Sequence, residues 1–171
     1  LGDGTTAGGY EVTHTYEEGG DYDVEVTVRL EEGTSKTITK TVEIQQYREA
    51  TNPGPVSSGV QFDIKGDPAG VHPKIDLGAV NNDPYFTDIT YKGYVRVPEG
   101  AAYEFSLTAD KKATLYVAGT EITSAHTGSS SGRIALAAGL HPIRVEYSET
   151  NAGQALKVTM DGPGMSGEIP A

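Results

Sequence analysis

The chain has 171 residues, including 22 glycines, 9 prolines and 10 tyrosines, and it contains no cysteine. This composition favours short strands joined by tight turns over long helices, and it excludes disulfide bonds and cysteine-bound zinc. The formal net charge of −11 disfavours binding to nucleic acid or to anionic membrane surfaces. The charge therefore predicts no nucleic-acid partner. No apolar run has the length that a membrane-spanning helix needs, so we also expect no membrane insertion.

The first 49 residues predict a module built from antiparallel strands. From Tyr22 to Leu30 every even position is apolar or aromatic and every odd position is polar, which is the period of a half-buried strand. Residues 37–44 repeat the alternation after a turn at 31–34, so the two segments predict a hairpin. Residues 10–16 are expected to form an earlier strand.

A second module is predicted after a linker at residues 50–59, where two prolines and two glycines interrupt any apolar periodicity. Short strands without a convincing helix predict a β-sandwich or a barrel for residues 60–171. The expected fold class is therefore all-β, with two β-sandwich modules in tandem. The segments with alternating apolar residues are 60–64, 91–97, 103–107, 115–117, 134–136, 143–147 and 156–160.

Three short motifs precede the alternating strand of the first module: Gly-Asp-Gly-Thr at 2–5, His-Thr-Tyr at 14–16 and Gly-Asp-Tyr at 20–22. In this combination, residues 1–46 resemble the polycystic-kidney-disease (PKD) domain. The resemblance implies an extracellular, immunoglobulin-like sandwich used as a spacer or for contact with polysaccharide or protein. The family's opening strands would precede Leu1, so we expect an N-terminally incomplete module. Its apolar face would then need cover from the second module, another copy or strands of a separate chain.

The second module carries its own motifs: Tyr-Lys-Gly-Tyr-Val at 91–95, Pro-Glu-Gly at 98–100, Tyr-Glu-Phe-Ser-Leu-Thr-Ala-Asp at 103–110 and Leu-His-Pro-Ile-Arg-Val-Glu-Tyr at 140–147. Residues 60–171 thereby resemble the anthrax protective-antigen-type domain, a β-sandwich of bacterial glycosidases, yeast adhesins and toxins. The resemblance implies an extracellular or cell-surface module without catalytic residues of its own.

The same resemblance bears on calcium. Lectin members of the family hold calcium with two successive aspartates, and here those positions read Asp110 and Lys111. A lysine repels the cation, which prefers six to eight oxygen ligands. We therefore expect no cofactor and little calcium binding, although a degenerate site could still combine Asp110 with Asp83.

The residue pattern gives little support for catalysis. His14, His72, His126 and His141 lack metal-ligand spacing. The serines at 129–131 lack the Gly-x-Ser-x-Gly nucleophile turn. We expect the chain not to be an enzyme.

A turn-rich stretch is the candidate glycan-binding loop, because rings that stack on sugars stand there beside amide and carboxylate groups. The alternative reading, which the usual burial of large aromatic residues favours, is a connection whose rings tuck under the sandwich. The candidate residues are Asn81, Asn82, Asp83, Tyr85 and Phe86.

Together these observations predict a noncatalytic extracellular accessory module of a larger protein, serving adhesion, spacing or carbohydrate contact. The expected partners are extracellular or cell-surface polysaccharide and other copies or modules of the parent protein. Two alternatives remain. One is a structural subunit of an extracellular polymer assembled by strand addition, and the other is an accessory part of a secreted glycoside hydrolase.

Overall fold

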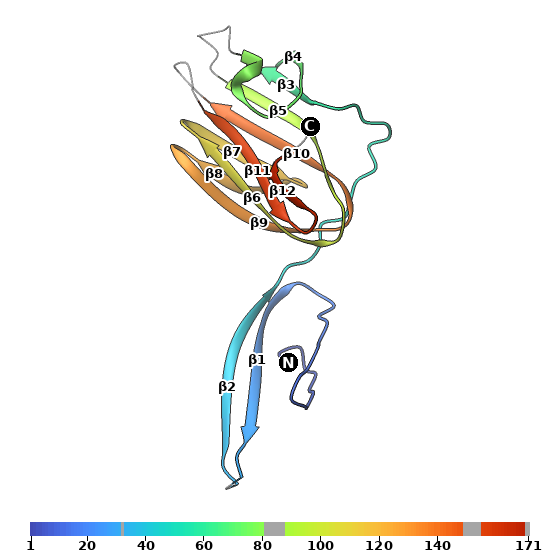
Figure 1. Ribbon diagram of the computed structural model, residues 1–171, viewed down its shortest axis with the longest axis vertical. Coiled ribbons are helices and arrows are strands. Elements are labelled where there is room, and N and C mark those ends of the chain that lie inside the picture. The colour runs from blue at the N-terminus through green and yellow to red at the C-terminus, as the bar shows by residue number, and fades with distance from the viewer. Residues whose placement is uncertain (32, 81–87, 149–154, 170–171) are drawn as a thin grey trace. The chain divides into compact units, whose positions relative to one another are not determined.

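The computed structural model describes residues 1–31, 33–80, 88–148 and 155–169. The chain forms two compact units, Leu1–Gln46 and Tyr47–Ala171. The predicted all-β sandwich fold is confirmed (Figure 1). Within the described residues the single helical element is the short 3-10 helix η1 (Leu77–Val80), and no helix there is long and apolar enough to cross a membrane.

The N-terminal unit contains the predicted hairpin. Strands β1 (Gly20–Arg29) and β2 (Ser35–Ile44) pair antiparallel, with Val26 opposite Ile38. No described residue of this unit is fully buried, and Val26 and Ile38 are both exposed. The described part of the unit therefore presents a single two-stranded layer.

The prediction of a strand at residues 10–16 is wrong, because this segment does not pair with another strand. Local side-chain contacts fix it instead. His14 Nε2 lies 2.6 Å from Asp3 Oδ2, and the Tyr16 hydroxyl donates to the carbonyl of Leu1 at 2.8 Å. These contacts fold the segment back on the start of the chain, and Tyr10 is left fully exposed.

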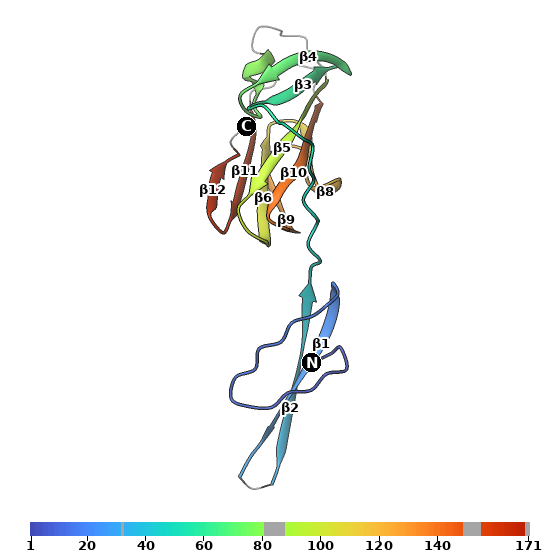
Figure 2. The same ribbon diagram turned by 90° about the vertical axis from the view of Figure 1, so that its right-hand side faces the viewer.

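The C-terminal unit is a sandwich of two antiparallel sheets (Figures 1 and 2). The six-stranded sheet has the order β4-β3-β5-β10-β7-β8, and the four-stranded sheet has the order β12-β11-β6-β9. The strands of the first sheet are β3 (Val60–Ile64), β4 (Asp67–His72), β5 (Asp88–Val97), β7 (Lys112–Val117), β8 (Thr120–Ala125) and β10 (Gly139–Ser148). Those of the second are β6 (Ala101–Ala109), β9 (Gly128–Leu136), β11 (Leu156–Gly162) and β12 (Met165–Glu168).

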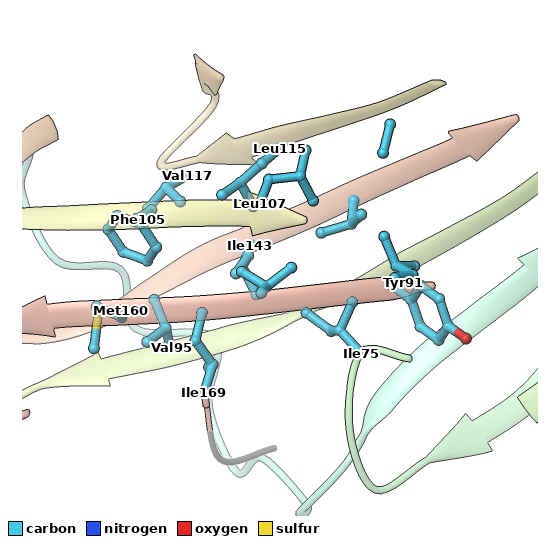
Figure 3. Close-up of a cluster of buried hydrophobic side chains, with 14 of the residues drawn as sticks. Ile75, Tyr91, Val95, Phe105, Leu107, Leu115, Val117, Ile143, Met160 and Ile169 are labelled. Atoms are coloured by element: carbon cyan, nitrogen blue, oxygen red, sulfur yellow. The ribbon is translucent and has the colours of Figure 1, made fainter. Parts of the chain in front are cut away.

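The core lies between these two sheets (Figure 3). Alternate residues of β6 point inward, so that Phe105 and Leu107 are completely buried, and Leu115 and Val117 of β7 meet them from the other sheet. Each predicted alternating segment of this unit lies in a strand. The sequence did not predict strands β4, β8 and β12, and each of these lies at the edge of its sheet.

The C-terminal unit also includes residues 48–51, which precede β3. The Arg48 N–H donates to the carbonyl of Ala135 at 2.8 Å, and the Thr51 N–H donates to the carbonyl of Leu140 at the same distance. These bonds hold residues 48–51 against the ends of β9 and β10.

Candidate functional site

The outward face of the six-stranded sheet carries a groove of about 1160 Å³. In β5 the odd-numbered residues other than Gly93 are buried, so Lys92, Tyr94 and Arg96 point away from the core. In the neighbouring β10, Pro142 is the partner of Tyr94 and Arg144 is the partner of Lys92. The groove floor is therefore built from alternate residues of two central strands.

The wall of the groove is formed by residues 53–59. In Figure 2 this stretch can be followed as the chain that leads into β3. This stretch supplies Pro53, Pro55 and Val56 to the lining. Proline has few backbone conformations, so the wall is stiffer than a glycine-rich loop of the same length. The segment predicted as a linker thus lines the groove.

Two tyrosine rings and one guanidinium organise the floor. Tyr94 is 39% exposed, and Tyr116 of β7 is partly exposed beside β10. The Arg144 guanidinium carbon lies 4.0 Å from the centroid of the Tyr116 ring, a cation–π contact. This contact fixes the orientation of both side chains before any ligand arrives.

The groove has a charge opposite to that of the chain. Its lining includes Lys92, Arg96 and Arg144 and, among the described residues, no aspartate or glutamate, although the chain carries a net charge of −11. Lys92 Nζ lies 2.6 Å from Asp63 Oδ2, and Arg144 pairs with Glu146. Both carboxylates lie outside the groove lining.

A second, smaller hollow of about 490 Å³ follows on the same sheet face and shares Tyr116 with the groove. Its lining is acidic, with Asp88, Glu121 and Glu146 against one lysine, Lys112. The outward face is therefore divided into a cationic part and an acidic part.

The residues of the glycan-binding loop predicted from the sequence are Asn81, Asn82, Asp83, Tyr85 and Phe86. They lie outside the described residues, so the loop stays a prediction.

Asp110, the other predicted ligand residue, has a structural contact. Its Oδ1 accepts a hydrogen bond of 2.8 Å from the hydroxyl of the buried Tyr147, and its N–H donates to the carbonyl of Ala155 at 3.2 Å. Within the described part of the chain no three acidic or histidine side chains gather closely enough to hold a metal ion. The expected weakness of calcium binding stays a prediction.

The four histidines occupy separate places. His14 contacts Asp3, His72 lies 2.9 Å from the carbonyl of Lys74, and His126 is exposed. His141 is completely buried, with Nε2 2.8 Å from the carbonyl of Ala137 and Nδ1 without a hydrogen-bond partner. Because His141 points into the core, it has no access to the groove.

The sequence reasoning missed Tyr94, Arg96, Tyr116 and Arg144. A usable signal existed for β5, because the alternation that buries Val95 and Val97 must expose the residues between them. No pattern in the sequence indicates that residues 140–144 lie beside them in the sheet.

The sandwich architecture defines the second unit as a β-sandwich domain, and its sequence specifies which one. Residues 79–170 match the model of the PA14 domain, and the chain belongs to this family. Residues 1–45 match the model of the PKD domain. Among curated proteins no sequence matches the chain.

Solved structures share the fold at low identity. An anti-sigma factor domain-containing protein from Clostridium clariflavum superposes with a TM-score of 0.56 at 16% identity, over 82% of this chain and 55% of that one. A subtype-switched epithelial adhesin A domain from Candida glabrata, in complex with beta-lactose, has a TM-score of 0.55 at 14% identity, over 72% of this chain and 88% of that one. A beta-glucosidase from Kluyveromyces marxianus, in complex with glucose, has a TM-score of 0.51 at 19% identity, over 67% of this chain and 18% of that one.

At these identities the similarity shows the fold alone. The chain spans 55% and 46% of the first two solved structures that it matches, both of them anti-sigma factor domain-containing proteins.

Proposed function

We propose that the chain is a noncatalytic extracellular accessory segment, in which the PKD unit acts as a spacer and the PA14 unit contacts carbohydrate. The observation that carries this proposal is the pair of tyrosine rings, Tyr94 and Tyr116, on the floor of the groove. An adhesin A domain with the same fold, matched over 88% of its length, was solved in complex with beta-lactose, and this supports the proposal.

The chemistry of the groove suits a polysaccharide. Pyranose rings present C–H faces that stack on aromatic side chains, while their hydroxyl groups exchange hydrogen bonds with polar neighbours. The volume of about 1160 Å³ exceeds the roughly 300–1,000 Å³ of ordinary small-molecule pockets. The groove therefore has room for several linked sugar residues.

Carbohydrate arrays test the proposal directly. The chain should bind at least one polysaccharide, and chelation of calcium should leave binding intact because the groove supplies no carboxylate ligands. Tyr94→Ala and Tyr116→Ala should weaken binding, and Tyr10→Ala, in the N-terminal unit, is the matched control. A chain that binds no carbohydrate, or whose binding ignores both groove substitutions, would refute the proposed contact. Binding that requires calcium would point to the loop at 81–86 instead.

Strand addition remains a second candidate because of the N-terminal hairpin. Among the described residues no third strand pairs with β1 or β2, and Val26, Val28 and Ile38 are exposed. Exposed apolar strands with unpaired edges are templates for another chain. Light scattering distinguishes the two functions, since concentration-dependent growth in mass supports assembly and a constant monomer mass supports the spacer.

A further inference from the structure

We infer that the groove selects acidic polysaccharides, those with carboxylate or sulfate groups, over neutral ones. This inference rests on the proposed carbohydrate contact and adds the ligand's charge to it. The chain as a whole would repel an anion at long range. The attraction to an acidic ligand must therefore come from the cationic side chains of the groove.

The cations stand where a ligand lying along the sheet would meet them. Lys92, Tyr94 and Arg96 follow one another at alternate positions of β5, which places them roughly 6.5–7 Å apart. Arg144 stands across from Lys92 on β10. A sugar ring stacked on Tyr94 thus has Arg96 on one side along the strand and Lys92, which is paired with Asp63, on the other.

Arg96 has the chemistry for anion recognition. It is exposed and pairs with no carboxylate of the described residues, so its charge is available to a ligand. Its planar guanidinium matches carboxylate and sulfate oxygens with two parallel hydrogen bonds. Arg144 is held over Tyr116 and paired with Glu146, so it adds a cation whose position is set before binding.

An acidic peptide is the competing ligand. Strand β5 pairs with β10 along its whole length, whereas β3 pairs with β5 only at Ile89–Lys92. Strand addition of a peptide is therefore limited to the short stretch of β5 at residues 93–97. The exposed rings of Tyr94 and Tyr116 favour a sugar, because pyranose faces stack on them, and a peptide probe in the experiment distinguishes the two ligands.

The experiment is calorimetric titration of the whole chain with matched ligand pairs at low salt. The pairs are polygalacturonate oligomers against the same oligomers after carboxyl reduction, and dextran sulfate against dextran. Poly-L-glutamate is the peptide probe. We expect at least one acidic member to bind about tenfold or more tightly than its neutral partner, with affinity falling as salt rises.

Arg96→Gln should lower the affinity for the acidic ligand about tenfold. Arg133→Gln is the matched control, because Arg133 lies on β9 of the other sheet with a side chain that is 65% exposed. Circular dichroism of both variants should show the wild-type fold, since neither side chain is buried.

The outcomes separate the inference from the proposed function. Equal affinity for acidic and neutral members, with loss of binding in Tyr94→Ala, would overturn the charge selection and leave carbohydrate contact standing. No binding of any sugar would overturn both. Binding of poly-L-glutamate as tight as that of the acidic sugar, or an unchanged affinity in Arg96→Gln, would also overturn the inference. Preference for the sulfate pair or for the carboxylate pair supports it and identifies the acidic group.

Discussion

Replacing Leu107 by alanine tests how much the core between the two sheets contributes to the stability of the C-terminal unit. Leu107 is completely buried, and it faces Val158 of β11 on one side and Ser130 of β9 on the other in the strand register. Truncating a buried leucine to alanine costs about 2–5 kcal/mol, from lost burial and from the cavity that remains. We expect the free energy of unfolding of the C-terminal unit to fall by this amount.

The matched variant is Leu30→Ala in the N-terminal unit, where the leucine is 54% exposed. Only part of the roughly 1.5–3 kcal/mol of a fully buried leucine is at stake there, so we expect a change of about 1 kcal/mol or less. Thermal unfolding followed by far-ultraviolet circular dichroism should show the difference. At about 4 °C per kcal/mol for a unit of this size, Leu107→Ala should lower the Tm by about 8–20 °C.

Two results would refute this reasoning. Equal shifts in Tm for the two leucine variants would mean that the N-terminal unit shares in the core. A Leu107→Ala shift of less than about 4 °C would mean that the two sheets are not packed as the structure has them. Tyrosine fluorescence is a second probe, since the chain has ten tyrosines and no tryptophan.

Three further predictions address the N-terminal turn, the calcium position and catalysis. Hydrogen bonds from the side chain and the N–H of Thr5, with the contact to His14, lower the pKa of Asp3. This stabilisation is therefore present above the ordinary Asp pKa of 3.8 and is lost as the pH falls below it. The protection factor of the Thr5 amide, which donates to Asp3 Oδ1, should therefore fall in acid, and in Asp3→Asn it should be low at every pH. Calorimetry should show weak or no calcium binding to the wild type and tighter binding to Lys111→Asp; tight wild-type binding that Asp110→Ala abolishes would contradict this. Purified chain should release no reducing sugar from polysaccharides, and turnover that a single point substitution removes would contradict the noncatalytic assignment.

The strands with a buried face were predictable from the sequence, because burial on one side imposes period two. The segment at 103–107 is a clear case, as Tyr103, Phe105 and Leu107 are all completely buried. The edge strand β12, with the sequence Met-Ser-Gly-Glu, has no such pattern, and pairing with β11 makes it a strand. The error at residues 10–16 has the opposite cause. The sequence of this segment alternates as a strand would, but the folded segment has no neighbouring strand with which to pair.

The groove was not predictable, for two physical reasons. Its residues come from strands far apart in sequence, and the register that sets Tyr94 opposite Pro142 is a property of the folded sheet. The wall at 53–59 also has the composition of a linker, and its proline and glycine content does not indicate that it lies along the groove. The composition of residues 81–86, with aromatic rings beside amide and carboxylate groups, instead predicted the glycan-binding site there.

Mapping of the bound sugar by nuclear magnetic resonance tests the central claim most directly. A uniformly nitrogen-15-labelled chain would be titrated with an acidic oligosaccharide that binds in calorimetry, and amide shifts would be followed residue by residue. We predict that the largest shifts fall at Lys92–Arg96 of β5, at Pro142–Glu146 of β10 (except for Pro142, which has no amide proton), around Tyr116 and along residues 56–59. Shifts confined to residues 81–88 and the turn at Asp110, with β5 and β10 unchanged, would contradict the account and place carbohydrate contact in the loops.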